Sequence, residues 1–320
     1  MSKLTIIIPV YNAQQTLPKC LDSINQQTNT DFTVLLINDG STDDSLAVAR
    51  SYEKEYPERY KIIDKQNEGV VKTRHLGIRE ATTEYIMFMD NDDFIDSNYV
   101  ATFMEAMQSG DFDMIIGGYR RATYEKTLYS VQAHNTEWTK YEISAPWAKL
   151  FRRKFIIDNR IHFLDNPIGE DVYFTMLACQ KTDKIKIIPY IGYNWYYNDA
   201  SVSNNEQKGL MNTSEIIKLL DSIYEVYKGQ MNPLVSYFFI RYVIWYLLFS
   251  GRNASTTQFL EVHTQLFSWL EEKKIHNTIR WYDTSIQGEP LKNRIAVSLL
   301  LFLRKIKATA LFSKIYCRGE

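Results

Sequence analysis

The chain has few cysteines, no excess of charge of one sign and no long uncharged apolar run. Its three cysteines, Cys20, Cys179 and Cys317, are far apart and odd in number, which excludes a disulfide framework and favours a reducing compartment. The formal net charge of −1 provides no overall field that would attract nucleic acid or anionic lipid, so any such attraction would have to be local. We therefore expect neither a disulfide-stabilised secreted domain nor a nucleic-acid-binding protein.

Signals for export or membrane insertion are also weak. The first three residues lead directly into a strand-like segment, without the apolar core of a signal peptide. The nearest candidate for a spanning helix, Leu234 to Gly251, is interrupted by Arg241 and is shorter than the roughly 20 residues that cross a bilayer. We interpret this segment as a buried core helix and expect a cytoplasmic protein.

Short apolar segments alternate with amphipathic ones over the first 120 residues. The predicted strands are residues 4–8, 33–37, 60–63, 85–89 and 113–117. The predicted helix faces between them consist of Leu17, Leu21 and Ile24, and of Val100, Phe103, Met104 and Met107. This alternation predicts an α/β fold with a Rossmann-like, doubly wound, mostly parallel sheet.

The pattern changes further along the chain. Residues 119–168 are less regular, residues 184–190 resemble another strand, and long helical segments follow residue 205. Ile216, Leu219, Leu220 and Ile223 share one face of the first of these helices. We therefore predict a catalytic domain over 1–205, with a nucleotide-binding half (1–118) and an acceptor-side half (119–205), followed by a helical C-terminal region (206–320).

Four polar clusters lie at or near the carboxyl ends of the predicted strands, at residues 11–12, 38–40, 66–67 and 90–93. Ligands of doubly wound sheets bind beyond these ends, so the clusters should converge on one crevice. The fourth cluster, Asp90-Asn91-Asp92-Asp93, places several carboxylates together, an arrangement that a divalent cation would relieve. A solvated acidic turn or a helix cap is the alternative interpretation of that cluster.

Three further motifs have both a functional and a structural interpretation. Asp39 is suited to accept a hydrogen bond from a base, although Ser41 or Asp43 also caps the next helix. Residues 67–74 begin a helix whose N–H groups favour an anion, although Lys72 and Arg74 also fit a surface basic pair. Gly169-Glu170-Asp171 fits either helix-dipole stabilisation or a general base.

Taken in order, these motifs resemble family 2 inverting glycosyltransferases of the GT-A fold. The resemblance covers about residues 4–203 and is carried by TIIIPVYN (5–12), INDGSTD (37–43), FMDNDD (88–93), APWAKLFRR (145–153) and GED (169–171). Each motif alone is weak, and the ordered set is specific. The chain departs from the family at Thr73-Arg74-His75, where many relatives have Ala-Arg-Asn, and at 193–203, which lacks a histidine to complete a metal site.

The resemblance implies a role for each matching residue. Pro9, Tyr11 and Asn12 would lie along the nucleotide, Asp39 would contact the uracil edge, and Asp90 would approach the ribose. The remaining implied nucleotide-sugar contacts are Gly69, Arg74, Asn91 and Trp147. Arg74 would face the donor phosphates or support the acidic cluster, and Trp147 would stack near the donor sugar or the acceptor.

Two more residues complete the implied reaction. Asp92 would hold Mn²⁺ or Mg²⁺ on the diphosphate, with water or Asn198 in place of the missing histidine. Asp171 would be the base that deprotonates the acceptor hydroxyl in a single displacement. The donor would be a UDP-sugar, and the acceptor a glycan, a lipid-linked molecule or a glycoprotein.

Other functions account for fewer of these residues. A sugar-phosphate nucleotidyltransferase would need a Gly-rich basic loop after the first strand, where Tyr11-Asn12-Ala13 stands instead. A dinucleotide oxidoreductase would need GxGxxG after a strand. A catalytically degenerate scaffold is disfavoured by the presence of Asp39, Asp92 and Asp171.

The segment 294–307 combines apolar and basic residues on one predicted helix. Such a helix fits a membrane surface, an oligomer interface or packing on the catalytic domain. We favour packing, because most apolar helix faces belong to a core. Peripheral membrane contact, at the inner face of the cell membrane, and homo-oligomer formation remain alternatives.

Overall fold

Strand β1 (Leu4–Val10) consists of seven consecutive buried residues, the pattern of a parallel strand covered on both faces. β1 pairs in parallel with β2 (Phe32–Asp39) and with β4 (Tyr85–Phe88), and β2 pairs in parallel with β3 (Tyr60–Lys65). This computed structural model describes residues 2–197 and 208–319, so Asn198 lies outside the described residues. The parallel pairing predicted for this half of the sheet is confirmed.

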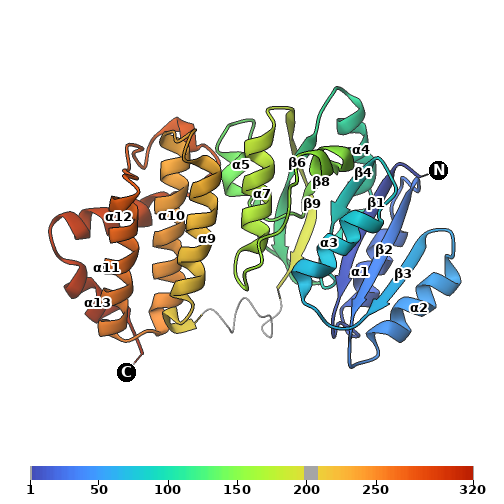
Figure 1. The fold of residues 1–320 in the computed structure, drawn as a ribbon, viewed down its shortest axis with the longest axis horizontal. Coiled ribbons are helices and arrows are strands. Elements are labelled where there is room, and N and C mark those ends of the chain that lie inside the picture. Colours follow the sequence, from blue (N-terminus) through green and yellow to red (C-terminus); the bar gives the residue numbers. More distant parts are fainter. Residues whose placement is uncertain (1, 198–207, 320) are drawn as a thin grey trace. The chain divides into compact units, whose positions relative to one another are not determined.

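The second half of the sheet contains the antiparallel pairs. β8 (Lys149–Arg152) runs antiparallel to both β4 and β6 (Met114–Ala122), and β6 pairs in parallel with β9 (Ile185–Tyr196). Two short strands, β5 (Phe94–Ile95) and β7 (Thr127–Val131), pair with β9 and β6. The resulting order is β3-β2-β1-β4-β8-β6-β9-β5, with β7 beside β6 (Figure 1).

Helices cover both faces of this sheet. The first face, which includes Ile6 and Ile8, packs against α1 (Leu17–Asn25), α2 (Ser45–Glu55) and α4 (Tyr99–Gln108). The second face packs against α3 (Val70–Glu80), where a Cβ atom at Gly77 would lie 2.3 Å from Ile7 Cγ2. α6 (Arg153–Asp158) follows β8, and α7 (Glu170–Lys181) presents Phe174 to Phe88. The predicted doubly wound α/β fold is therefore confirmed.

The chain divides into two units. The first unit contains residues 1–135, 143–165 and 170–197, and the second contains 136–142, 166–169 and 198–320. The helices of the second unit are α5 (Thr139–Glu142), α9 (Thr213–Tyr227), α10 (Pro233–Ser250), α11 (Thr256–Glu272), α12 (Leu291–Lys305) and α13 (Thr309–Tyr316). The predicted apolar face of α9 is confirmed, because Ile216, Leu219, Leu220 and Ile223 are all buried. The helical C-terminal region is thus present.

α10 is the helix that was interpreted above as a core helix. Together with the following turn, through Asn253, it is long and apolar enough to cross a membrane, but most of that segment is buried. Arg241 of α10 donates from Nε to Glu289 Oε1 at 2.7 Å, and Glu289 also accepts from Trp138 Nε1 at 3.1 Å. Because Glu289 is only 2% exposed, these contacts fix a buried charge in the second unit. The arrangement is that of a core helix.

Replacing Glu289 with alanine should reduce the free energy of unfolding by about 3 kcal/mol, because Arg241 would keep its charge without the carboxylate that offsets it. Chemical denaturation monitored by tryptophan fluorescence measures this change. The matched control is Glu272→Ala, an exposed site in α11, which should change stability by less than about 0.5 kcal/mol. Equal effects of the two substitutions would contradict the proposed role of the buried pair.

Candidate active site

The acidic loop after β4 places its carboxylates in different environments. Asp93 is completely buried and accepts hydrogen bonds from the Tyr193 hydroxyl and, at 2.8 Å, from the Tyr196 backbone N–H. Burial, with the charges of Asp92 and Asp90, raises the pKa of Asp93 well above its usual range. Asp93 therefore supports the loop by attaching it to β9.

Asp92 is only partly buried, whereas Asp93 is completely buried. Within the described parts of the chain, Asp92 forms no ion pair. Burial and the nearby charge of Asp90 raise the pKa of Asp92 to about 6. Asn91 lies between the two carboxylates and donates from Nδ2 to the Pro9 carbonyl at 2.9 Å, which fixes the loop against the end of β1. Asp90 and Asp92 are thus held close together with their mutual repulsion only partly offset.

Arg74 connects this loop to the start of α7. Its Nη2 lies 3.0 Å from Asp90 Oδ1, its Nη1 lies 3.0 Å from Glu170 Oε1, and its guanidinium stands over the Phe163 ring. Burial lowers the pKa of Arg74, but the charges of Asp90 and Glu170 raise it overall. Of the two roles expected for Arg74, support of the acidic cluster is the one visible in these contacts.

Asp171 occupies the first turn of α7, directly after Glu170. Its Oδ1 accepts from the Val172 N–H at 2.8 Å. Burial and the charge of Glu170 raise the pKa of Asp171 to about 7, although Arg74 acts in the opposite direction. A carboxylate with a pKa near neutrality is suited to accept a proton from a hydroxyl group.

Hydrogen bonds connect the loops that follow β1 and β2. Asn12, with a φ of 46°, accepts from the Thr42 N–H at 2.8 Å, and its own N–H donates to Ser41 Oγ at 3.1 Å. Tyr11 is 49% exposed beside them. Asn91 contacts Pro9 and the cluster at 38–40 approaches Asn67, so neighbouring strand-end loops lie close together, and their convergence on one crevice stays a prediction.

Asp39 is the last residue of β2 and accepts hydrogen bonds from the residues that precede α3. Its Oδ1 accepts from Lys65 Nζ and from the Glu68 N–H at 2.9 Å, and its Oδ2 accepts from the Gly69 N–H at 2.9 Å. Burial would raise the pKa of Asp39, but the hydrogen bonds from Lys65 and Glu68 lower it overall. Asp39 is 4% exposed, and a side-chain hydrogen bond with Thr73 also lowers its pKa.

Trp147 comes shortly before β8 and contacts β9. It is 8% exposed and stacks on the Tyr193 ring, with centroids 4.8 Å apart and an interplanar angle of 3°. Lys149 secures the segment before it, because Nζ donates to the Ile143 and Ala145 carbonyls at 2.6 Å. In this arrangement Trp147 supports Tyr193, and a sugar-stacking role remains a prediction.

The oxygen ligands near Asp92 fit a hard divalent cation. The described residues contain no group of three or more Asp, Glu, His or Cys side chains arranged to hold a metal ion. His75 is directed elsewhere, since its Nε2 accepts from the Phe163 N–H at 2.9 Å. Asp92 would suit Mg²⁺ or Mn²⁺ that takes its other ligands from water and a diphosphate.

Two residues near the site were not predicted from the sequence. Tyr193 hydrogen-bonds to Asp93 from 100 positions away, so no local motif marks it. Arg121 is 5% exposed, lies 3.6 Å from the centre of the Trp195 ring, and has no hydrogen-bond partner for Nη1 among the residues described. A buried arginine with an available donor, in the field of Asp92 and Asp93, is a candidate ligand contact.

Comparison with known proteins gives consistent matches. A family model described as Glycosyl transferase family 2 matches residues 5–170. The chain is 28% identical over 221 residues to Glycosyltransferase GlyA of Streptococcus pneumoniae serotype 4, which covers 63% of this chain and 31% of that protein. It is 30% identical over 208 residues to the poly(ribitol-phosphate) beta-glucosyltransferase of Bacillus spizizenii, covering 61% of this chain and 32% of that protein. The aligned part is about a third of the length of each relative.

A solved structure shows the same fold. The crystal structure of S. aureus TarS 1–349 in complex with UDP is similar with a TM-score of 0.66, covering 98% of this chain and 90% of that chain. The sequence identity is 18%, so this likeness establishes the GT-A fold and no further property.

Arg74→Met should lower the free energy of unfolding by about 3 kcal/mol at pH 8, because Asp90 and Glu170 would lose the cation between them. The loss should be smaller at pH 5, where protonation of Asp171 reduces the negative charge of the cluster. Thermal unfolding at both pH values measures it. Arg79→Met, an exposed site in the last turn of the same helix, is the control, and a pH-independent loss at Arg74 would refute this account.

Proposed function

Because the chain belongs to glycosyl transferase family 2, we propose that it transfers a hexose or N-acetylhexosamine from a UDP-sugar to a hydroxyl group, with inversion at the anomeric carbon. The observation that carries the proposal is the double ion pair of Arg74, which joins Asp90 of the acidic loop to Glu170, the neighbour of Asp171. Through this contact the donor-side carboxylates and the base candidate belong to one cluster.

The nucleotide half of the proposal depends on the ends of β1, β2 and β4. Asp39 contacts the uracil edge, and Gly69 leaves the approach open, since a Cβ there would meet no atom within 4 Å. Pro9, Tyr11 and Asn12 extend along the nucleoside, and Asp90 lies on the ribose side. UDP bound to a protein of the same fold supports this choice of nucleotide.

The diphosphate half of the proposal depends on Asp92. Burial and the charge of Asp90 raise its pKa, a divalent cation would offset that charge, and we assign Mn²⁺ or Mg²⁺ to this carboxylate. A bound cation supplies positive charge against the charge that develops on the departing UDP. Asn91 holds the loop on β1, and Arg121 is placed to donate to a phosphate or a sugar hydroxyl.

The acceptor half of the proposal assigns one proton transfer to Asp171. The carboxylate accepts the proton of the acceptor hydroxyl while the hydroxyl oxygen attacks the anomeric carbon of the sugar. The bond from that carbon to UDP breaks on the opposite face. No covalent nucleophile is needed in a single displacement. The relative named for glucosylation of poly(ribitol phosphate) supports a cell-wall polymer or a similar glycan as acceptor. The free thiols of all three cysteines fit a cytoplasmic enzyme.

UDP should raise the melting temperature of the chain in the presence of Mn²⁺ or Mg²⁺ and much less in EDTA. At a UDP concentration of about 100 times Kd, the expected stabilisation is about 2.7 kcal/mol. Differential scanning fluorimetry with UDP and GDP measures the effect, and Asp92→Asn should remove most of it. Stabilisation by UDP that is unaffected by EDTA would contradict the role of the metal ion. A larger shift with GDP than with UDP would contradict the choice of a UDP-sugar as donor.

Asp171→Asn should reduce kcat by about 10³-fold while leaving UDP binding unchanged, because the amide cannot accept the acceptor proton. The wild-type rate should fall as the pH drops below about 7, where Asp171 becomes protonated. Transfer from UDP-[¹⁴C]glucose or UDP-[¹⁴C]GlcNAc to a wall-polymer preparation measures both. Asp158→Asn, an exposed site in α6, is the control, and an Asp171→Asn variant of wild-type activity would assign the base elsewhere.

A further inference from the structure

The C-terminal segment 291–319 concentrates positive charge. It contains seven basic residues and no acidic residue, whereas the other residues carry 30 basic and 38 acidic side chains. Two of the seven are engaged within the second unit, since Arg304 pairs with Glu271 and Arg294 donates to the Glu289 carbonyl. Five of the seven have exposed side chains, whatever their contacts: Lys292, Lys305, Lys307, Lys314 and Arg318.

The same segment exposes an apolar stripe. On α12 and the residue after it, the stripe consists of Leu291, Ile295, Leu299, Phe302 and Ile306, which are 48–57% exposed. Their spacing of three or four residues places them on one helix face. Val297 and Leu300, on the other side of α12, are buried. α12 therefore packs within the second unit through one face only, and a second apolar face is left in contact with solvent; packing on the catalytic domain stays a prediction.

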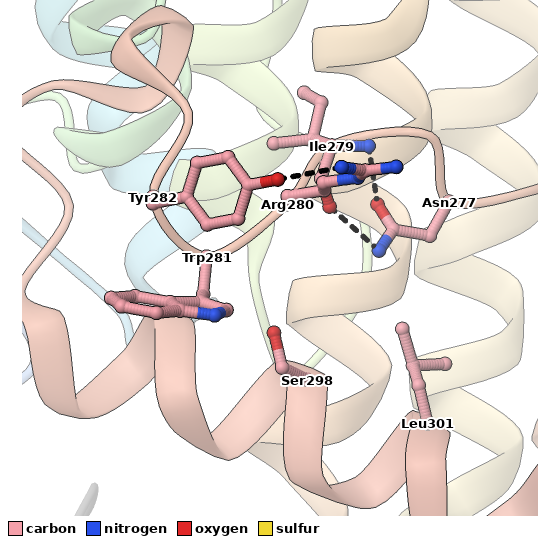
Figure 2. A pocket seen from close by; sticks show the side chains of 7 residues that line it. All are labelled: Asn277, Ile279, Arg280, Trp281, Tyr282, Ser298 and Leu301. Carbon is pink, nitrogen blue, oxygen red and sulfur yellow. Dashed lines mark hydrogen bonds between the residues drawn. The ribbon is translucent and has the colours of Figure 1, made fainter.

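Neighbouring elements of the second unit also expose apolar and aromatic side chains. On α13, Leu311 and Ile315 are 64% and 78% exposed and lie one turn apart. Trp281 and Tyr282 are about half exposed and line a hollow of about 420 Å³ together with Ser298 and Leu301 of α12 (Figure 2). Aromatic side chains with one polar end are suited to the boundary between water and the acyl chains of a bilayer.

We propose that α12, α13 and the Trp281-Tyr282 turn form a docking surface for an anionic lipid bilayer. The apolar stripe would enter the boundary between head groups and acyl chains, and the exposed lysines would contact lipid phosphates. Charge decides against a second copy as the occupant. A twofold interface would bring the same exposed basic residues of each copy together, whereas anionic lipids complement them.

The experiment is co-sedimentation of the full chain with vesicles of phosphatidylglycerol and phosphatidylcholine, compared with phosphatidylcholine alone. We expect binding to the anionic vesicles that weakens with added salt. Lys305→Glu with Lys307→Glu should weaken binding roughly 20-fold or more, because each lysine near the surface contributes about fivefold. Leu299→Asn with Phe302→Asn should also abolish stable binding, by removing the centre of the stripe.

Ile157→Asn with Lys61→Glu is the matched control, since both residues are exposed and lie in the first unit. Circular dichroism and melting temperature establish that each variant is folded. Absence of binding to anionic vesicles at low salt, or equal binding by the docking-surface variants and the control, overturns the proposal. A wild-type dimer in light scattering that Leu299→Asn with Phe302→Asn converts to a monomer also overturns it. The assay uses no donor or acceptor, so its outcome is separate from that of the transfer assays.

Discussion

The buried guanidinium of Arg74 is the interaction on which the candidate site depends. It satisfies one carboxylate that follows β4 and another that begins α7, two motifs separated by 80 residues of sequence. Three acids in this region, Asp90, Glu170 and Asp171, would otherwise repel one another at neutral pH. Because Arg74 is supplied by α3, whose close approach to the sheet requires Gly77, the position of the cation is set by core packing.

The acidic loop shows how one short motif yields separate chemical properties. Asp93 is buried and hydrogen-bonded on both oxygens, so it contributes to structure, whereas Asp92 keeps a carboxylate with a raised pKa. Cys20 lies beneath the loop, and burial raises the pKa of its thiol well above the ordinary value. The reactive thiolate of Cys20 is thereby disfavoured, so the groups of this loop that can bind a cation are its carboxylates.

Much of the parallel half of the fold could be predicted from the sequence, because a strand buried on both faces is a continuous apolar run. β5, β7 and β8 were not predicted, since β5 has two residues, β7 is mostly exposed, and β8 contains a buried lysine, Lys149. The strand-end clusters were predictable because parallel strands end at one edge. Tyr193 and the Arg74–Glu170 pair were not, because nothing local in the sequence specifies contacts across about 100 residues.

Strand β9 has a consequence for how far this region can vary. Tyr193 reaches Asp93, the Tyr196 N–H reaches the same carboxylate, and Asn194, on the opposite face, hydrogen-bonds to Asp96. A shift of the strand by a single residue would invert all of these side chains at once. We therefore expect variation in length to be tolerated in the exposed turn between β6 and β7, and not within β9. The register of β9 thus sets the position of the acidic loop. An insertion in β9 would alter the chemistry of the site without changing a reacting group.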